Sequence, residues 1–310
     1  METPSSELSK TLQALSNDLA DTVARISQAV VAVHGRHRIP SSGVHWQPGV
    51  IVTAEHTVKR EEDIFVTLPD NRTLPAQLAG RDASTDLAVL KLTGVELPVA
   101  EIGDSQALKV GHLMLAVGRA GENGATASLG VISALSGSWR TWSGGKIDQF
   151  VRLDMTSYPG FSGSALVNAQ GQIVGINTFG PRSMVLALPA STVKRIVTQL
   201  LEKGRIARGY LGLGLQAVQL PDSLVTKLNL SGRGGVIVVT VKSSGPAEKA
   251  GVLIGDILID IDGKLVNDTN DIQSALEPGQ VGKALKTKIV RGGNLLELEI
   301  IVGELPRRDD

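Results

Sequence analysis

Three short segments of the sequence contain residue types that together can hydrolyse a peptide bond. His56 ends a β-type run in T-A-E-H-T-V, Asp86 opens another in S-T-D-L-A-V-L-K-L, and Ser162 lies in the glycine-flanked stretch Y-P-G-F-S-G-S-A-L. A serine hydroxyl is a weak nucleophile until a base takes its proton, and a histidine can take that proton and return it to the leaving amine. A buried aspartate fixes the imidazole tautomer and stabilises the imidazolium. The sequence therefore predicts a hydrolase with His56, Asp86 and Ser162 as its catalytic triad.

The order of these residues along the chain separates this candidate from other hydrolases. The order His, Asp, Ser is that of chymotrypsin-type enzymes, whereas α/β-hydrolases run Ser, Asp, His. The G-x-S-x-G elbow of those hydrolases is not met, because position 164 is Ser. A subtilisin-type order would need an aspartate before His56, and the candidates there, Asp18 and Asp21, lie in a predicted helix. The chymotrypsin-type arrangement is therefore favoured.

Glycines around Ser162 give the predicted nucleophile loop a second function. Gly160 allows the backbone to turn so that the N–H groups of Gly160 and Ser162 point at one place. Two such donors form an oxyanion hole, and the loss of one typically costs about 10²–10³ in turnover. Gly163 leaves space beside the nucleophile. Taken singly, each feature also fits an ordinary loop, a capping aspartate or a structural histidine, so the prediction depends on the three segments together.

Short apolar runs that alternate with turns must position these segments. Runs rich in Val, Ile and Leu are separated by Gly, Pro, Asp and Asn, as at 50–53, 64–68, 87–92, 113–117, 131–135, 150–153, 165–167, 173–176 and 184–188. Roughly ten such strands in about 160 residues predict a β-barrel or β-sandwich domain. A helix over 193–203, stopped by Gly204, follows these strands.

The rest of the chain, residues 209–305, has the texture of one small mixed domain. It combines strands at 234–241, 285–290 and 295–302 with two short helices at 246–250 and 270–276. A length of about ninety-five residues is ordinary for a single domain. The stretch 203–208 reads as a short linker to it.

The first thirty residues contain an apolar stripe at helical spacing. The stripe consists of Leu8, Leu12, Leu15, Leu19, Val23, Ile26 and Val30. Its spacing predicts an amphipathic helix. The stripe either packs on its own domain or forms a self-associating coiled coil, which would make the protein a homo-oligomer. Both interpretations stay open at this point.

Composition excludes several kinds of partner and cofactor. Basic and acidic residues balance at 31 each, so no global field steers the chain to nucleic acid or to an anionic membrane. The absence of cysteine excludes disulfides, thiolate metal sites and a Cys nucleophile. His34, His37 and His45 fit no common metal spacing, and no phosphate-binding motif follows G-E-N-G-A. We expect neither a metal nor a cofactor.

The N-terminal residues also bear on location. They include Glu2, Glu7, Asp18 and Asp21, and their longest apolar run is only 29–33, which does not resemble a secretory signal. No window approaches the ~18 apolar residues of a membrane span. Read literally, the sequence predicts a cytoplasmic protein. The alternative is the cell envelope or periplasm, if an upstream signal is missing.

Longer stretches around the three segments form the pattern of a known family. The pattern runs through S-S-G (41–43), I-V-T-A-E-H, L-A-G-R-D-A-S-T-D-L-A-V-L-K-L, E-I-G-D-S-Q-A-L-K-V-G, L-A-V-G, G-V-I-S-A-L, G-Q-I-V-G-I-N-T and L-A-L-P. Residues 21–203 resemble the protease domain of the HtrA/Deg family of trypsin-like serine proteases, and 208–303 resemble its PDZ domain. The resemblance implies that His56 is the base, Asp86 its orienter and Ser162 the nucleophile.

The apolar stripe and the resemblance together predict a domain plan and a fold class. An N-terminal amphipathic helix over 1–30 precedes a mainly β, two-barrel chymotrypsin-like protease domain over 31–204. A small α+β PDZ domain over 209–305 completes the chain.

The sequence departs from the family around the nucleophile. The family usually has Asn before the serine and Gly-Gly-Pro after it, whereas this chain has Phe161 before it and Gly163, Ser164 and Ala165 after it. The backbone donors survive these changes, because every residue except proline has an N–H. After L-A-V-G the usual Asn-Pro is replaced by Arg119 and Ala120.

Residues near the nucleophile suggest the substrate preference. Thr156, six positions before Ser162, should form the floor of the primary specificity pocket, and it is not a carboxylate that would select Lys or Arg. Ser157 and the strand that contains Met184, Val185 and Leu186 would favour a small or medium aliphatic side chain.

The second domain contains a PDZ-like signature. The stretch G-P-A-E-K-A-G-V-L-I-G-D-I-L-I-D-I-D-G-K-L-V reads as a helix, a turn and a strand, and by itself this motif is also compatible with a domain that has no ligand. Y-L-G-L, residues Tyr210, Leu211, Gly212 and Leu213, is the type of loop that presents N–H groups to a C-terminal carboxylate. The helix at 270–276 should form the other wall of the groove.

The function expected from these features is an ATP-independent serine endopeptidase that acts on unfolded or damaged proteins. Its PDZ domain would bind hydrophobic peptide C-termini and thereby deliver substrate or activate the protease. A pseudo-protease, with an altered nucleophile loop that no longer turns over and serves as a peptide-binding scaffold, is the alternative. A chaperone activity that holds unfolded chains is compatible with the first interpretation.

Overall fold

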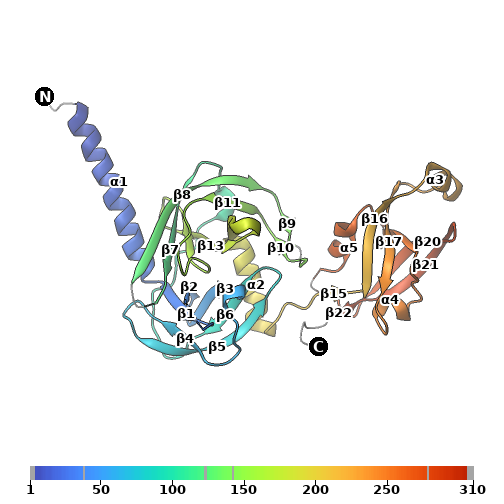
Figure 1. The fold of residues 1–310 in the computed structure, drawn as a ribbon, viewed down its shortest axis with the longest axis horizontal. Helices are drawn as coiled ribbons and strands as arrows, with labels where there is room; N and C mark the ends of the chain where they lie inside the picture. Colours follow the sequence, from blue (N-terminus) through green and yellow to red (C-terminus); the bar gives the residue numbers. More distant parts are fainter. Residues whose placement is uncertain (1–3, 38, 122–123, 142, 278, 306–310) are drawn as a thin grey trace. The chain divides into compact units, whose positions relative to one another are not determined.

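The computed structural model describes residues 4–37, 39–121, 124–141, 143–277 and 279–305, and the chain folds into two compact units (Figure 1). The first unit is Met1–Ile206 and the second is Ala207–Asp310. The first unit contains two closed six-stranded antiparallel barrels, the chymotrypsin-like architecture, and the second is a small α+β sheet domain. The expected fold class, mainly β with two barrels followed by a small α+β domain, is confirmed.

The first barrel is built from strands that bury both faces. In spatial order its strands are β1 (Val30–His34), β2 (Ser41–Gln47), β3 (Val50–Ala54), β6 (Leu87–Lys91), β5 (Thr73–Asp82) and β4 (Ile64–Thr67). In β3, Ile51 points into the barrel interior, while Val50 and Val52 point to the cluster between the barrels. This double burial explains why these strands read as continuous apolar runs instead of alternating ones.

The second barrel repeats this design. In spatial order its strands are β11 (Phe150–Asp154), β14 (Val185–Pro189), β13 (Ile173–Phe179), β12 (Ala165–Val167), β7 (Leu113–Arg119) and β8 (Ala125–Ser136). Met114 and Ala116 of β7 face the barrel interior, and Leu115 and Val117 face the cluster between the barrels. A hairpin of β9 (Trp139–Arg140) and β10 (Lys146–Ile147) leaves this barrel between β8 and β11.

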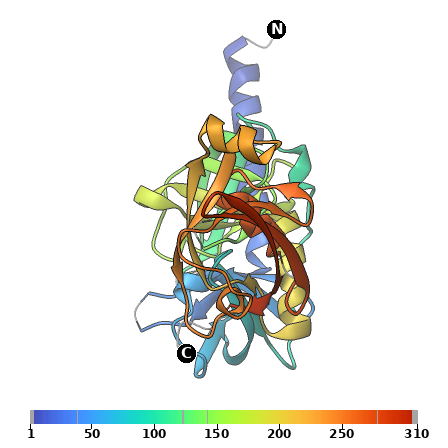
Figure 2. The ribbon, with the colours of Figure 1, turned by 90° about the vertical axis from the view of Figure 1, so that its right-hand side faces the viewer.

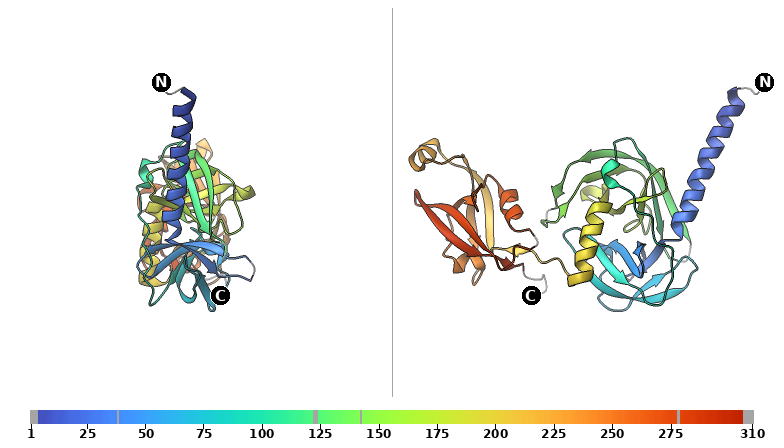
Figure 3. Two further views of the ribbon diagram at one scale, coloured as in Figure 1. Left: turned by 90° about the vertical axis from the view of Figure 1, so that its left-hand side faces the viewer. Right: turned by 180° about the vertical axis from the view of Figure 1, so that it is seen from behind.

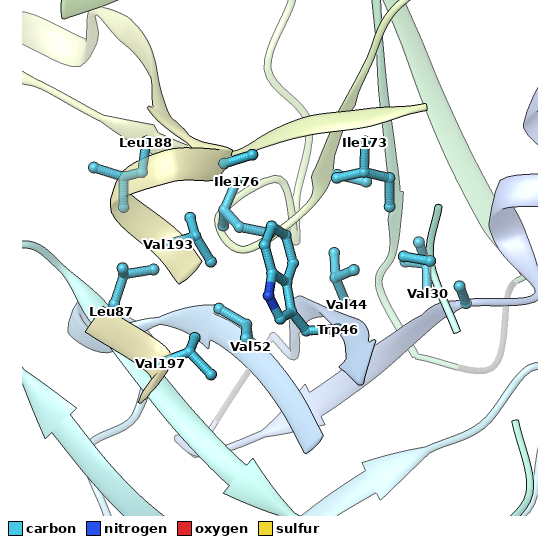
Figure 4. Close-up of a cluster of buried hydrophobic side chains, with 14 of the residues drawn as sticks. Val30, Val44, Trp46, Val52, Leu87, Ile173, Ile176, Leu188, Val193 and Val197 are labelled. Carbon is cyan, nitrogen blue, oxygen red and sulfur yellow. The ribbon is translucent and has the colours of Figure 1, made fainter. Parts of the chain in front are cut away.

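A shared hydrophobic core joins the two barrels (Figure 4). Trp46 lies at its centre, among Val44 and Val52 of the first barrel and Ile176 of the second. Helix α2 (Ala190–Lys203) covers this core with Val193, Ile196, Val197 and Leu200, and Figure 3 shows it lying against both barrels. As expected, α2 ends at Gly204, which has a left-handed φ of 70°. The shared core and α2 therefore hold the two barrels together.

Helix α1 (Pro4–Ser27) packs on the second barrel with its C-terminal half only. Leu19 and Val23 are partly buried against the shared core and Ile26 is fully buried, whereas Leu8, Leu12 and Leu15 are 62%, 59% and 47% exposed. The N-terminal half projects from the barrels (Figures 1 and 3). Packing of the helix on its own domain is thus observed for its C-terminal half, and self-association through the N-terminal half stays a prediction. Among the described residues, no helix is both long and apolar enough to cross a bilayer.

The second unit is an antiparallel sheet with short helices (Figure 2). Its strands run in the order β16 (Leu213–Gln219), β17 (Gly234–Val241), β18 (Ile257–Ile261), β20 (Ala284–Arg291) and β21 (Asn294–Ile301), with β19 (Lys264–Leu265) beside β18. β15 (Gly209–Tyr210) pairs with β22 (Gly303–Glu304). Helices α4 (Pro246–Lys249) and α5 (Thr269–Ala275) lie where the sequence predicts them.

The prediction of two helices in this unit is wrong, because a third, α3 (Asp222–Leu228), follows Pro221. It buries no residue fully, and its apolar face, Leu224, Val225 and Leu228, packs only partly against a small cluster that contains Leu220 and Ile259.

Candidate active site

His56 and Asp86 both come from the first barrel, at the ends of adjacent strands. The 3-10 turn η1 (Glu55–Thr57) directly follows β3 and presents His56, while Asp86 immediately precedes β6, the partner of β3. Nδ1 of His56 lies 2.9 Å from each carboxylate oxygen of Asp86, and the His56 backbone N–H donates to Oδ1 at 2.9 Å. Pairing of two neighbouring strands therefore fixes the contact between imidazole and carboxylate.

The loop before β6 holds Asp86 in an unusual conformation. Asp86 has a left-handed φ of 57°, which Asp tolerates better than most residues. The carboxylate of Asp82 accepts hydrogen bonds from the hydroxyls of Ser84 and Thr85, each at 2.7 Å. From the β9–β10 hairpin, Thr141 Oγ1 donates to the Ser84 carbonyl at 2.7 Å. Hydrogen bonds from both barrels thus hold the backbone of Asp86 in its left-handed conformation.

Ser162 approaches the histidine from the second barrel. It lies in the loop between β11 and β12, and its Oγ is 3.0 Å from Nε2 of His56. Since Nδ1 faces the carboxylate of Asp86, that nitrogen holds the imidazole proton and Nε2 accepts from the serine hydroxyl. The His56 side chain is 40% exposed, so a substrate can reach it from solvent. The structure brings the three predicted side chains into one hydrogen-bonded line.

Thr178, near the end of β13, is a functional neighbour that the sequence analysis did not single out. Its hydroxyl donates a short hydrogen bond to Oδ2 of Asp86. The Asp86 carboxylate therefore accepts from a side chain of the second barrel as well as from His56. Thr178 is the last residue of the motif G-Q-I-V-G-I-N-T, but that motif does not reveal that the threonine faces the aspartate.

The nucleophile loop leaves two backbone amides without a partner. Phe161 N–H donates to Tyr158 O at 3.0 Å and Ser164 N–H donates to Phe161 O at 3.0 Å. In the described part of the chain, the N–H groups of Gly160 and Ser162 make no hydrogen bond. These are the two amides expected to form an oxyanion hole.

Two glycines of this loop are required by its geometry. Gly160 and Gly163 both have a left-handed φ of 84°. A Cβ at Gly163 would also lie 2.1 Å from the Ser42 carbonyl oxygen of the first barrel.

The residues that replace the family pattern are buried below the loop. The Phe161 side chain is 1% exposed and packs against the rings of Tyr158, at 5.3 Å, and Phe179, at 5.4 Å. Ser164 is fully buried and accepts from Asn177 Nδ2 at 3.0 Å. Burial raises the pKa of the Tyr158 hydroxyl, and hydrogen bonds with Thr126 and Ser164 offset only part of that effect. These side chains hold the loop from the interior of the second barrel and are not exposed at the surface of the active site.

Arg119 is buried as well and links the barrels. Its Nη1 donates to Asn71 Oδ1 at 3.3 Å and its Nη2 to Pro69 O at 3.4 Å, in the turn between β4 and β5. Burial lowers the pKa of the guanidinium. Arg119 thus connects β7 of the second barrel to the β4–β5 turn of the first.

The residues assigned to the specificity pocket differ in their burial. Thr156 and Ser157 are exposed on the segment that follows β11, and Met184 is half-buried before β14. Val185 and Leu186 are buried in β14, where they pair with Phe179 and Thr178 of β13. Apolar side chains therefore lie on the strand beside Thr178, and no carboxylate is present among these five positions.

The Y-L-G-L loop of the second unit opens an edge strand. Leu211 O accepts from Ala247 N–H at 2.9 Å and Gly212 O from Lys242 N–H at 2.8 Å, and Gly212 has a φ of 79°. In the described structure, the N–H groups of Leu211 and Gly212 have no hydrogen-bond partner. Leu213 then begins β16, an edge strand of the sheet, and α5 packs beside β16. A peptide could therefore add to β16 and place its carboxylate at these amides.

The histidines outside the triad have structural partners. Nδ1 of His45 lies 2.9 Å from Pro98 O, and its Nε2 accepts from Gly49 N–H at 3.0 Å. His34 bonds to Thr67, and His37 to Arg60. Over the residues that the structure describes, no group of three or more His, Asp or Glu side chains could hold a metal ion.

Two family models match the chain. A trypsin-like peptidase domain matches residues 41–176, and a PDZ domain matches residues 209–302.

Curated relatives are named probable periplasmic serine endoproteases, DegP-like. One from Pseudomonas putida (strain GB-1) is 33% identical over 267 residues, and one from Chlamydia trachomatis is 33% identical over 269 residues. These matches cover 84% and 85% of this chain. The chain spans about half the length of these relatives, at 55% and 53%.

Solved structures match over nearly their whole length. The serine endoprotease from Yersinia pestis is 30% identical with a TM-score of 0.75, over 92% of this chain and 97% of that one. The HtrA-type protease AlgW with tripeptide is 31% identical with a TM-score of 0.75, over 94% and 98%. The same protease with decapeptide gives 28% identity and a TM-score of 0.76, over 93% and 99%.

The cytoplasmic location expected from the sequence is wrong. The curated relatives are named periplasmic endoproteases and point to the periplasm or cell envelope. The expectation used the acidic, weakly apolar first thirty residues. Residues Pro4–Ser27 form the amphipathic helix α1, so their composition is that of a helix with one polar face.

Proposed function

Because the chain belongs to the HtrA/Deg family of trypsin-like serine endopeptidases with a PDZ domain, we propose that it hydrolyses peptide bonds of unfolded or damaged polypeptides without ATP. In this proposal Ser162 attacks the scissile carbonyl, and His56 takes the serine proton and returns it to the leaving amine. Asp86 holds the imidazole tautomer, and the amides of Gly160 and Ser162 stabilise the oxyanion.

One observation supports this proposal above all others. A carboxylate, an imidazole and a hydroxyl, drawn from two barrels, are joined by contacts of 2.9 Å and 3.0 Å. A histidine that was only structural would not need a serine hydroxyl on one side and a carboxylate on the other. No specific observation favours the pseudo-protease scaffold.

The test of this activity is hydrolysis of casein by the full chain and by the S162A variant. We expect the variant to lose activity by about 10⁴-fold or more, since triad members act as a unit. S136A, which changes an exposed serine at the end of β8, is the matched control and should keep full activity. Equal hydrolysis by S162A and the unchanged chain would refute the proposal. A chaperone activity toward unfolded chains, if present, would persist in S162A.

We propose that the primary specificity pocket accepts a small or medium aliphatic side chain. Thr156, Ser157, Met184, Val185 and Leu186 provide neutral or apolar groups near the nucleophile loop. A carboxylate at the pocket floor would be needed to pair with Lys or Arg. Cleavage-site profiling of a denatured proteome should therefore show Val, Ile, Ala or Leu before the cut. A profile dominated by Lys and Arg would contradict this assignment.

We propose that Tyr210, Leu211, Gly212 and Leu213 bind the C-terminus of a hydrophobic peptide. The unpartnered amides of Leu211 and Gly212 and the free edge of β16 support this, and a related HtrA-type protease has been solved with bound peptides. Comparing the affinity of one peptide with a free and with an amidated C-terminus separates recognition of the carboxylate from nonspecific hydrophobic binding. We expect amidation to weaken binding by at least about tenfold. Equal affinities would exclude a carboxylate site.

The peptide is proposed either to deliver substrate or to activate the protease. Hydrolysis of a short chromogenic substrate with a blocked C-terminus, which lacks the carboxylate that the second unit is proposed to bind, distinguishes the two. Activation predicts a faster rate with added peptide, whereas delivery predicts no change.

We propose further that the chain self-associates through Leu8, Leu12 and Leu15 of α1. These three exposed leucines, at spacings of four and three residues, form an apolar stripe that a second copy of the same helix can cover. Sedimentation of the full chain and of the triple variant with Glu at these positions tests this. Equal sedimentation coefficients for the full chain and the triple variant would rule out association through this stripe of leucines.

A further inference from the structure

Ser42 occupies a buried position where the two barrels meet beside the nucleophile loop. It belongs to β2 of the first barrel and has no exposed surface. No step of the proposed reaction assigns it a function. Its backbone and side chain nevertheless contact the loop that contains Ser162.

The hydrogen bonds of Ser42 converge on the Gly160 carbonyl. Ser42 Oγ donates to Gly160 O at 2.6 Å, and Ser42 N–H is shared between Gly160 O and Ser162 O, each at 3.0 Å. Ser42 Oγ in turn accepts from Arg119 N–H of β7 at 2.9 Å. The hydroxyl therefore has both a donor and an acceptor partner, and its rotamer is fixed.

These bonds fix the peptide plane between Gly160 and Phe161. Its oxygen is held by Ser42, and its N–H is held by Tyr158 O at 3.0 Å. The two neighbouring planes provide the unpartnered N–H groups of Gly160 and Ser162. If the plane at 160–161 rotates, the backbone torsions of Gly160 and Phe161 change, and the two amides no longer converge on one point.

We propose that the Ser42 hydroxyl is a positioning residue for the oxyanion hole, acting through the Gly160 carbonyl. This inference rests on the proposed peptidase function. Glycine at 160 has no Cβ to restrict its torsions, so external hydrogen bonds must restrict them. Ser42 belongs to β2 of the first barrel, and the same barrel also presents His56. Ser42 therefore fixes the position of the oxyanion-hole amides relative to the catalytic base.

The first variant to test is S42A in the full chain, measured with a chromogenic peptide that has an aliphatic residue before the cut. Complete loss of one oxyanion donor costs about 10²–10³ in turnover, so displacing donors should lower kcat by about 10- to 100-fold. KM should stay within about twofold, because oxyanion contacts form only in the transition state. The affinity of the matching peptide aldehyde, whose adduct with Ser162 holds an oxyanion, should fall by the same factor as kcat.

A matched control separates positioning from a general loss of buried hydrogen bonds. S105A removes another buried serine, whose Oγ accepts from Ser191 N–H at 3.4 Å outside the active site. It should lower the melting temperature without changing kcat. The low-field NMR resonance of the His56 Nδ1 proton should be unchanged in S42A, since the imidazole and Asp86 are untouched.

A second variant keeps the proposal testable if S42A folds poorly. S42C keeps a donor at this position, but its thiol is larger and a weaker donor than the hydroxyl, so its kcat should lie between those of S42A and the unchanged chain. If S42A and S42C show kcat and aldehyde affinity equal to those of S105A, the inference is wrong although the peptidase function stands. An unchanged chain that hydrolyses no peptide and forms no aldehyde adduct would instead refute the proposed function and this inference with it.

Discussion

At the scale of single residues, the active site shows which groups a sequence can reveal. His56, Asp86 and Ser162 could be predicted because each lies in a distinctive motif and their chain order excludes other hydrolase types. Thr178 could not, because its hydrogen bond to Asp86 depends on how β13 of one barrel meets the loop before β6 of the other. From the sequence Phe161 is only a departure from the family pattern, and the structure places its side chain in the core of the second barrel.

Removal of the Thr178 hydroxyl tests its contribution to the carboxylate. T178V keeps the shape of the side chain but leaves Asp86 with one donor fewer. We expect kcat to fall by about tenfold with KM unchanged, since the loss of a charge-assisted hydrogen bond is typically worth 1.5–3 kcal/mol and part is recovered by solvent. Steady-state kinetics on a peptide substrate measure this. A KM that rises while kcat is constant would show that Thr178 contacts substrate instead.

At the scale of elements, strands were predicted best where both faces are buried. β3 and β6 are continuous apolar runs because one face fills a barrel and the other joins the shared core. The first half of β8, residues 125–130, was missed because Ala, Thr, Ser and Gly dominate it and exposed and half-buried positions alternate there, with none buried. Helix α3 was missed for a similar reason, since none of its residues is fully buried.

The shared core predicts how α2 stabilises the first unit. Ile196 is 1% exposed in the cluster that joins the barrels. I196A should destabilise the unit by about 2–5 kcal/mol through lost burial and a cavity. Calorimetry of the full chain should show the first unit melting earlier, while the transition of the second unit stays in place. An equal shift of both transitions would mean that the two units unfold as one.

In the second unit, an ion pair predicts a pH-dependent stability. Burial raises the pKa of Asp256, but hydrogen bonds from Arg291 and from Leu253 N–H outweigh that effect and leave the pKa below its ordinary value. Because the pKa of Asp256 is lower in the folded state, its ionised carboxylate stabilises the folded unit at pH values above the unfolded-state pKa of about 3.9. This stabilisation is lost as the pH falls through the folded-state pKa.

The variant D256N tests this prediction. It should destabilise the second unit by about 1–3 kcal/mol at pH 7, since Arg291 is one-third exposed and part of its charge stays solvated. Denaturant titrations at pH 7 and pH 3 should show the difference from the unchanged chain shrinking at the lower pH. If the difference in unfolding free energy between D256N and the unchanged chain did not change with pH, the ion pair would not be its cause.

At the scale of the whole molecule, function depends on bringing together segments that are distant in sequence. The chain order of His56, Asp86 and Ser162 predicts one site, but only the joining of two closed barrels explains how the hydroxyl meets the imidazole. The family resemblance found from the motifs extended correctly to both units. The location inferred from the first thirty residues was wrong, since the curated relatives are named periplasmic endoproteases.

Covalent labelling by a fluorophosphonate tests the central claim most directly, because only an activated serine reacts with it quickly. Peptide mapping by mass spectrometry should find a single adduct, on Ser162. Its rate of formation should fall by at least about 10³-fold in H56A, where the base is gone. An adduct on another serine, no adduct at all, or an equal rate in H56A would contradict the assignment of Ser162 as a nucleophile activated by His56.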